Sequence, residues 1–316
     1  MKRQKKAKDE YRGFEQGPIR PPSEAGSLLI RVTRNCPWNR CSFCPVYKGT
    51  RFSTRQVAHV KRDIDMVKRY IDVLRENSGK SDDIGKIRIP HAARIYDPGE
   101  QQALSAALHW FANGMKSVFI QDANSLIIKP AELIEILAYL KKAFPMAERI
   151  TSYARSHTIA RIKDPDLKAM NNAGLNRIHI GLESASDAVL KTMNKGVTKA
   201  THIQAGLKVK TAGMELSEYV MPGLGGQQLS HEHAVETADA LNQINPEFIR
   251  LRTLAIPNNV PLFEEFTEGR FDKCTDLMMA KEILMFIENL NGITSVVKSD
   301  HILNLFEDVE GTLPGD

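Results

Sequence analysis

Three of the four cysteines in this 316-residue chain lie within nine positions, in the stretch RNCPWNRCSFCPVYKG (34–49). Cys36, Cys41 and Cys44 have the spacing C-x4-C-x2-C. Thiolates this close together are typical ligands of a zinc ion or an iron–sulfur cluster, and stable metal sites in proteins usually have four ligands. The chemistry of the stretch therefore depends on what supplies the fourth ligand.

The sequence offers several answers for the fourth ligand. Cys274 lies far along the chain, and a lone cysteine is more often a small buried residue than a ligand. Zinc is disfavoured because no second C-x2-C or histidine pair completes a site, although His59 remains a candidate ligand. A cluster held by three cysteines leaves one iron open to a small molecule, which is the hypothesis we favour. The alternative is an iron–sulfur protein for electron transfer or structure, with Cys274 or another side chain as fourth ligand.

Alternating strands and helices must position this cysteine loop. We expect strands at 28–33, 116–122, 149–154, 176–182, 215–221 and 247–254. We expect helices at 53–77, 99–113, 130–144, 164–174, twice within 186–213, and at 229–244 and 273–290. Six strands separated by helices predict an α/β fold, a partial (β/α)6 TIM-like barrel with a C-terminal helical extension. An open doubly wound sheet has the same alternation.

The composition divides the chain into three parts. Residues 1–26 form a basic leader and a Pro/Gly/Ser-rich linker that we expect to be disordered. Residues 27–255 form the core barrel, and residues 256–316 form a helical segment packed on it. Residues 1–12 hold six basic and two acidic residues, while the whole chain has a net charge of +5. Contact between this leader and RNA or anionic lipid is the alternative to a solubilising role.

The totals favour a cytoplasmic globular protein. Hydrophobic residues make up 42% of the chain and charged residues 26%, which is typical of a folded soluble protein and not of a disordered one. No apolar stretch approaches the roughly 20 residues that cross a bilayer, and the N-terminus lacks the apolar segment of a signal peptide. Four cysteines do not suggest a disulfide framework.

The loop CPWNRCSFC after a first strand resembles the cluster-binding loop of the radical S-adenosylmethionine (SAM) superfamily. The resemblance implies a 4Fe–4S cluster held by Cys36, Cys41 and Cys44, with SAM chelating the remaining iron. It also implies that Phe43 lies near the adenine. The usual spacing of this superfamily is C-x3-C-x2-C, so the present loop has one extra residue.

Two later segments extend the resemblance. Gln121, Asp122 and Ala123 stand where the superfamily has a Gly-Gly-Glu segment that receives the amino group of SAM. The stretch IHIGLESASDAVLKTMNKG (178–196) resembles the GLES segment of the Elongator-like and oxygen-independent coproporphyrinogen oxidase-like branch. Glu183 in this segment is expected to accept hydrogen bonds from the ribose or the amino group of the methionine part.

Arginines complete the expected site. Arg155, at the tip of SYARS, resembles an arginine common in that branch and is expected to pair with a carboxylate. Arg250 and Arg252 alternate along FIRLRTLAIPNNVPLFEEF, so both would point into the barrel and would need carboxylate or buried acid partners. Arg252 is expected to contact the cofactor.

The resemblance implies an enzyme that cleaves SAM reductively to a 5′-deoxyadenosyl radical, which abstracts hydrogen from a substrate that the sequence does not identify. An external one-electron donor, such as a flavodoxin or a ferredoxin, is then required. Only Cys274 is spare, which disfavours reactions that need an auxiliary cluster. An RNA-modifying enzyme of the same superfamily, using residues 1–12, is the alternative.

Overall fold

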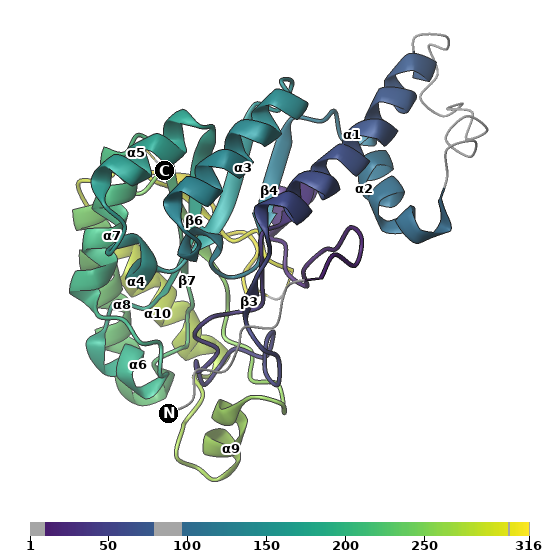
Figure 1. Ribbon diagram of the computed structural model, residues 1–316. Helices are drawn as coiled ribbons and strands as arrows, with labels where there is room; N and C mark the ends of the chain where they lie inside the picture. The colour runs from purple at the N-terminus through teal and green to yellow at the C-terminus, as the bar shows by residue number, and fades with distance from the viewer. Residues whose placement is uncertain (1–9, 79–96, 303, 316) are drawn as a thin grey trace, which may run out of the picture.

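The computed structural model describes residues 10–78, 97–302 and 304–315. Its centre is a sheet of eight strands in the order β1-β4-β5-β6-β7-β8-β9-β10 (Figure 1). The strands are β1 (Leu28–Arg31), β4 (Ser117–Gln121), β5 (Arg149–Ala154), β6 (Leu175–Glu183), β7 (Glu215–Val220), β8 (Phe248–Leu251), β9 (Val296–Lys298) and β10 (Gly311–Thr312). All neighbouring pairs from β1 to β9 are parallel, and β10 is antiparallel to β9.

The strand order decides between the two architectures that the sequence allows. Along the sheet, the strands follow one another in the same order as they do along the chain. In a doubly wound sheet the strand order reverses once, and here it does not. Within the described residues β1 does not pair with β9 or β10, so the barrel is partial. The expected partial barrel of six parallel strands is confirmed, while β9 and β10 lie in a segment that we expected to be helical.

The helices of the described residues mostly cover the outer face of the sheet, whereas α9 lies apart from the strands (Figure 1). They are α1 (Val57–Ser78), α2 (Gln101–Ala112), α3 (Pro130–Ala143), α4 (Ser156–Ile159), α5 (Asp164–Asn172), α6 (Asp187–Thr192), α7 (Lys199–Thr211), α8 (Gly226–Ile244), α9 (Pro261–Thr267) and α10 (Asp276–Glu288). In α1 the apolar residues at three- and four-residue steps, Val60, Ile64, Val67 and Ile71, are buried. They join the outward side chains of the sheet, such as Ile180 of β6, in one core.

Aromatic side chains fill the inside of the barrel. The ring centroids of Phe119 and Tyr153 lie 5.3 Å apart, those of Tyr153 and His179 5.5 Å, and those of His179 and Tyr219 5.7 Å. These residues come from β4, β5, β6 and β7, and they alternate with the outward apolar residues of the same strands. The barrel floor is thus closed, and space remains at the C-terminal ends of the strands.

A short antiparallel pair, β2 (Thr33–Arg34) and β3 (Ser53–Thr54), joins the two ends of the cysteine-bearing loop. The loop therefore leaves the end of β1 and returns beside it before α1 begins. This arrangement puts the cysteines at the C-terminal edge of the sheet, which is where β/α barrels place their active sites.

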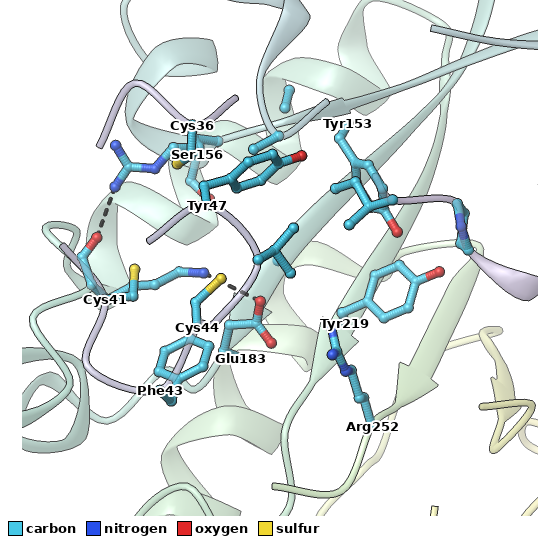
Figure 2. A pocket seen from close by; sticks show the side chains of 18 of the residues that line it. Cys36, Cys41, Phe43, Cys44, Tyr47, Tyr153, Ser156, Glu183, Tyr219 and Arg252 are labelled. Atoms are coloured by element: carbon cyan, nitrogen blue, oxygen red, sulfur yellow. Dashed lines mark hydrogen bonds and ion pairs between the residues drawn. The ribbon is translucent and has the colours of Figure 1, made fainter. Parts of the chain in front are cut away.

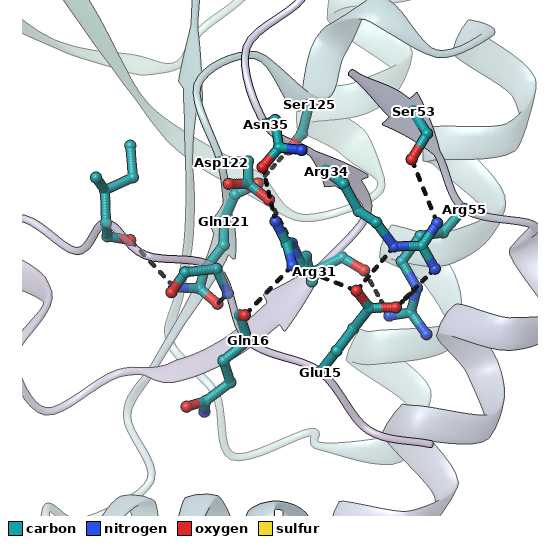
Figure 3. Close-up of polar contacts among 12 residues, drawn as sticks. Glu15, Gln16, Arg31, Arg34, Asn35, Ser53, Arg55, Gln121, Asp122 and Ser125 are labelled. Atoms are coloured by element: carbon teal, nitrogen blue, oxygen red, sulfur yellow. Dashed lines mark hydrogen bonds and ion pairs between the residues drawn. The ribbon is translucent and has the colours of Figure 1, made fainter. Parts of the chain in front are cut away.

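Residues 10–22, which we name the N-terminal strap, are packed against the barrel, in contrast to the disordered leader that we expected. Phe14 is buried, and Glu15 forms ion pairs with Arg31, Arg34 and Arg55 (Figure 3). Further on, residues 22–24 form a 3-10 helix, η1 (Pro22–Glu24), in which Glu24 is fully buried. The anchors come from distant parts of the chain, so composition alone could not reveal them. Residues 1–9 lie outside the described residues.

The C-terminal part contains α10, which matches the expected helix at 273–290, together with α9, β9 and β10, which we did not expect. Among the residues that the structure describes, no helix is both long and apolar enough to cross a membrane.

Candidate active site

A cavity of about 300 Å³ lies at the C-terminal ends of the barrel strands (Figure 2). Eight of the ten site residues expected from the sequence line it: Cys36, Cys41, Phe43, Cys44, Ala123, Arg155, Glu183 and Arg252. Arg155 follows β5, Glu183 ends β6, and Arg252 follows β8. Parallel strands thus bring together residues that are up to about 200 positions apart in the chain.

Backbone and side-chain contacts hold the cysteine loop in place. Asn39 takes a left-handed conformation (φ 46°), and its side chain donates to Tyr47 O at 2.5 Å. Lys48 Nζ donates to Cys41 O at 2.8 Å. Trp38 Nε1 donates to Asn194 O at 2.7 Å, which ties the loop between Cys36 and Cys41 to the segment after α6. The loop is therefore anchored on both sides of its second cysteine.

The donor set suits an iron–sulfur cluster. The three thiols are half-buried and line one cavity. Burial raises the pKa of Cys41 and Cys44, and the positive charge of Lys195 opposes this effect at both thiols. Across the described ranges, no three His, Cys, Asp or Glu side chains converge as ligands of a single metal ion. Thiolates spread around a cavity match a multi-iron cluster, in which different irons take different cysteines, better than one tetrahedral zinc ion.

Positive groups surround the cysteines. Arg155 Nη2 donates to Lys195 O at 2.7 Å, and its guanidinium carbon lies 5.0 Å from the ring centroid of Trp38. Lys195 Nζ lies 3.3 Å from Glu183 Oε1 and 5.8 Å from the ring centroid of Phe43. We did not single out Lys195 from the sequence, although it lies in the same 178–196 stretch as Glu183.

The backbone at the end of β6 is specialised. Glu183 has a φ of +66°, which side-chain-bearing residues rarely adopt and which is often found at functional sites. A Cβ atom added at Gly181 would lie 2.3 Å from Glu183 Oε1 and 3.2 Å from Lys195 Nζ. The absence of a side chain at Gly181 therefore allows the Glu183 carboxylate to fold back over the strand.

The structure does not bring Gln121 and Asp122 to the cavity, contrary to our expectation for their side chains (Figure 3). Gln121 Oε1 accepts from Gly17 N at 2.8 Å, and its Nε2 donates to Ile19 O at 3.0 Å. These bonds hold the N-terminal strap. Of the expected 121–123 segment, only Ala123 lines the cavity.

Asp122 supports the site from behind. It accepts from Arg31 Nε at 2.6 Å and from the Tyr47 hydroxyl at 2.9 Å. Because Tyr47 belongs to the cysteine loop and Arg31 to β1, the buried carboxylate of Asp122 joins the loop to the sheet. The family resemblance places this acid beside the cofactor, and in the structure its side chain holds the cysteine loop on the sheet.

The two inward-facing arginines of the last core strand differ. Arg250 is buried and forms an ion pair with Asp300, as the need for a buried acid partner predicted. Arg252 lines the cavity. Cys274 is buried in the main hydrophobic core and does not line the cavity, so it does not meet the other three cysteines there.

Other lining residues escaped sequence reasoning. These residues include Pro18, Ile19, Arg20, Pro21, Pro22, Tyr47, Tyr153, Ser156, His202 and Tyr219. The tyrosines at inward-facing strand positions could have been found from the period-two alternation of the strands, which puts every second side chain inside the barrel. The strap residues carried no such signal, because their place depends on the contacts of the strap with Gln121 and with three distant arginines.

Comparison with known proteins agrees with this geometry. The family model described as the Radical SAM superfamily matches residues 30–238, which include the cysteine loop and strands β4 to β7. The chain belongs to the radical SAM superfamily. Enzymes of this superfamily use a 4Fe–4S cluster and SAM, and the expected recognition is confirmed.

Individual radical SAM relatives match only in part. The chain is 28% identical over 197 residues to 4′-phospho-dehydrooxetanocin synthase of Priestia megaterium, an alignment that covers 60% of this chain and 22% of that protein. It is 21% identical over 145 residues to the heme chaperone HemW of Bacillus subtilis, covering 45% of this chain and 38% of that protein. The chain thus spans about a fifth to two fifths of these curated relatives.

Solved radical SAM structures share the fold. Coproporphyrinogen III oxidase (HemN) from Escherichia coli has a TM-score of 0.51 at 15% identity, covering 84% of this chain and 52% of that chain. The radical SAM methyltransferase TsrM from Kitasatospora setae, solved with tryptophan and a SAM analogue, has a TM-score of 0.51 at 16% identity, covering 78% of this chain and 39% of that chain. At these identities the likeness shows the fold and leaves the substrate open.

Proposed function

We propose that this radical SAM enzyme binds a 4Fe–4S cluster through Cys36, Cys41 and Cys44, and SAM in the adjoining cavity. The observation that carries this proposal is the convergence of the three cysteines with Arg155 and Glu183 on one cavity at the C-terminal ends of the strands. When bound, the cluster supplies the electron that cleaves SAM reductively and yields a 5′-deoxyadenosyl radical for hydrogen abstraction from the substrate.

The residues of the chain orient SAM and shield it from water. Lys195 holds Glu183 Oε1, which leaves Oε2 available to accept a hydrogen bond from the ribose or the amino group of SAM. Arg155 offers its guanidinium to a carboxylate beside the cysteines. Phe43 is buried between the second and third cysteines and gives an apolar wall for the adenine. Ala123 lets the ligand approach the end of β4 closely.

The position of Cys274 argues against the electron-carrier alternative. That alternative needs a protein side chain as fourth ligand, and Cys274 packs into the hydrophobic core away from the cavity lining. A cavity beside the three cysteines has room for a small molecule instead.

An RNA-modifying enzyme remains the second candidate for the substrate. One relative, 20% identical over 139 residues, is named tRNA uridine(34) acetyltransferase of Methanocaldococcus infernus, and this chain covers 26% of it. Deleting residues 1–9 tests this candidate without removing Tyr11, whose hydroxyl donates to Asp63 at 2.9 Å. Unchanged binding of tRNA by the shortened protein, measured against salt concentration, would remove the basis for this candidate.

The test of the main proposal is anaerobic reconstitution with iron and sulfide, followed by reduction in the presence of SAM. We expect the wild-type protein to release 5′-deoxyadenosine and methionine, with dithionite or with a reduced flavodoxin or ferredoxin as donor. The Cys274→Ala variant is the matched control and should behave as the wild type. An intact cluster that yields no 5′-deoxyadenosine, combined with loss of the cluster in Cys274→Ala, would establish the carrier alternative.

A further inference from the structure

The cavity has two ends of different chemistry (Figure 2). The cysteine end holds Cys36, Cys41 and Cys44 with Arg155 and Lys195. The tyrosine end holds Tyr153, Tyr219 and Arg252, and Figure 2 shows these three side chains on the far side of Glu183 from the cysteines. Of the two ends, only the tyrosine end is not explained by the proposed binding of the cluster and SAM.

Arg252 differs from the other positive groups of the cavity. Arg155 donates to Lys195 O, Lys195 pairs with Glu183, and Arg20 Nη1 donates to Ala25 O at 3.0 Å. The guanidinium of Arg252 makes no hydrogen bond or ion pair with any residue that the structure describes, although Arg252 is only partly exposed and lines the cavity.

The backbone fixes Arg252 in this position. Its amide donates to Val220 O at 2.9 Å, and the next amide, of Thr253, donates to Asn304 Oδ1 at 3.0 Å. The segment is thus bonded both to β7 and to the C-terminal region. Arg252 therefore reaches the cavity from a braced backbone position.

The surroundings leave the charge of Arg252 without a counter-charge. Asp300 is already paired with Arg250, and Glu183, which lines the same cavity, is paired with Lys195. Burial and the charge of Arg252 lower the pKa of His301, so this histidine is neutral near pH 7. A partly buried guanidinium without an acid partner is costly, and its planar fork fits a carboxylate through two parallel hydrogen bonds.

We propose that the tyrosine end binds a small substrate that carries a carboxylate, with Arg252 pairing with that carboxylate and Tyr153 and Tyr219 contacting its apolar part. This inference rests on the proposed function and names the substrate class of the same site. One guanidinium matches the single charge of a carboxylate, whereas a phosphate dianion would call for a second positive group. The strap residues Pro18, Pro21 and Pro22 add apolar surface to the lining. The cavity of about 300 Å³ includes the end proposed for SAM, so the space left at the tyrosine end favours a compact substrate.

The carboxylate of SAM belongs to the other end of the cavity. The guanidinium of Arg155 lies 5.0 Å from the ring centroid of Trp38 and Lys195 Nζ lies 5.8 Å from that of Phe43, and both rings belong to the cysteine loop. Arg252 lies on the far side of Glu183 from the cysteines (Figure 2). Arg155 and Lys195 are therefore the cavity-lining cations beside the cysteine loop. Under this inference Arg252 contacts the substrate and not the cofactor, which differs from our expectation from the sequence.

The test measures binding to reconstituted protein that is already saturated with SAM, by anaerobic titration calorimetry. The probes are benzoate, phenylacetate and hexanoate, each compared with its neutral amide. We expect at least one carboxylate to bind at least tenfold more tightly than its amide. Arg252→Gln should abolish this difference, Arg252→Lys should restore part of it, and the matched control Arg20→Gln should leave it unchanged.

The outcomes separate this inference from the proposed function. If the wild-type protein forms no cluster that responds to SAM, the proposed function itself fails. If the cluster and SAM bind normally, three results would overturn the inference alone. The first is that no carboxylate binds more tightly than its amide, or that Arg252→Gln leaves this difference unchanged. The second is competition between the carboxylates and SAM. The third is a tenfold loss of SAM affinity in Arg252→Gln. The last two would assign Arg252 to the carboxylate of SAM.

Discussion

Lys195 Nζ and Glu183 Oε1 lie 3.3 Å apart, next to the position that a side chain at Gly181 would occupy. This ion pair at the end of β6 lies between the cysteine end and the tyrosine end of the cavity. The pair is largely shielded, with exposed side-chain fractions of 12% for Lys195 and 15% for Glu183. Ion pairs in such surroundings are screened much less than surface pairs. The Lys195–Glu183 pair can therefore hold one carboxylate oxygen firmly while the other faces a ligand.

Gly181→Ala should weaken SAM binding about tenfold, by ~1.4 kcal/mol, with little effect on stability. The new Cβ would lie 2.3 Å from Glu183 Oε1, so the carboxylate must move, and the end of a flexible side chain can do so at low cost. Glu183→Gln should weaken SAM binding in the same direction. The prediction fails if Gly181→Ala binds SAM as tightly as the wild type while Glu183→Gln binds it more weakly. Gly181 would then not be needed to make room for the Glu183 carboxylate.

Replacing Cys36, Cys41 or Cys44 singly by Ser should remove the visible absorbance and the iron of the reconstituted protein. Cys274→Ala should keep both, because Cys274 is buried in the core and does not line the cavity. It should lower the free energy of unfolding by about 1 kcal/mol, since only a small buried group is lost. Iron analysis and denaturant unfolding check the two effects separately.

Asp63→Ala should lower the free energy of unfolding by about 3 kcal/mol, because it removes the carboxylate that accepts from both Arg55 Nη1 and the Tyr11 hydroxyl, leaving Arg55 with its pair to Glu15. The exposed side-chain fractions of this pair are 0% and 1%, and the Asp63–Arg55 distance is 2.6 Å. Asp72→Ala on the same helix is the control, since its pair with Lys68 is exposed and should contribute under about 1 kcal/mol. If urea unfolding shows the same loss of free energy in both variants, the buried pair is no more stabilising than the exposed one.

Glu218 should make the protein less stable as the pH rises. Both carboxylate oxygens are buried without a hydrogen-bond partner in the described part of the chain, and burial raises the pKa of Glu218 well above its usual 4.5. The folded pKa is above the unfolded one, so stability is fully present below about pH 4.5 and is lost as the pH rises toward the folded value.

The measurement compares the wild type with Glu218→Leu and Glu218→Gln in denaturant unfolding at pH 5 and pH 8. Relative to both variants, the wild type should lose up to about 1.4 kcal/mol per pH unit above the unfolded pKa. A wild-type pH profile parallel to that of both variants would show that Glu218 is not buried as an unpaired acid.

Gln121→Leu should release the N-terminal strap. The substitution removes the hydrogen bonds to Gly17 N and Ile19 O and puts an apolar side chain of similar size in place of the amide. We expect proteolytic cleavage within residues 10–22 to become at least tenfold faster. Gln243→Leu is the control, since Gln243 is exposed and bonds only to Asp239 on its own helix. Unchanged cleavage in Gln121→Leu would mean that the other anchors, Tyr11, Phe14 and Glu15, are enough to hold the strap.

The alternation of apolar runs predicted the barrel well because parallel β/α units leave a local pattern. The core strands lie within three residues of the expected ranges, and the strand–loop–helix context of Cys36, Cys41 and Cys44 is as expected. The expected strand 149–154 matches β5 (Arg149–Ala154). The two added strands, β9 and β10, are only three and two residues long, too short to give a periodic signal.

Local patterns did not reveal which polar groups would meet. The acid at position 122 looked like a cofactor ligand by its place in the chain, yet its neighbours Arg31 and Tyr47 take both of its oxygens. The strap looked disordered from its composition, yet three arginines from two other segments hold Glu15. Such pairings depend on distances between residues far apart in sequence, which composition and periodicity do not contain.

The sequence by itself determined the order of the barrel units, the cysteine triad and the superfamily, because these depend on period, spacing and residue type within short stretches. Only the tertiary structure decided that Arg250 is neutralised by Asp300 while Arg252 faces the cavity unpaired. The two arginines are two residues apart on the same face and look equivalent in the sequence. Their difference arises because Asp300, from the far C-terminal region, reaches one and not the other.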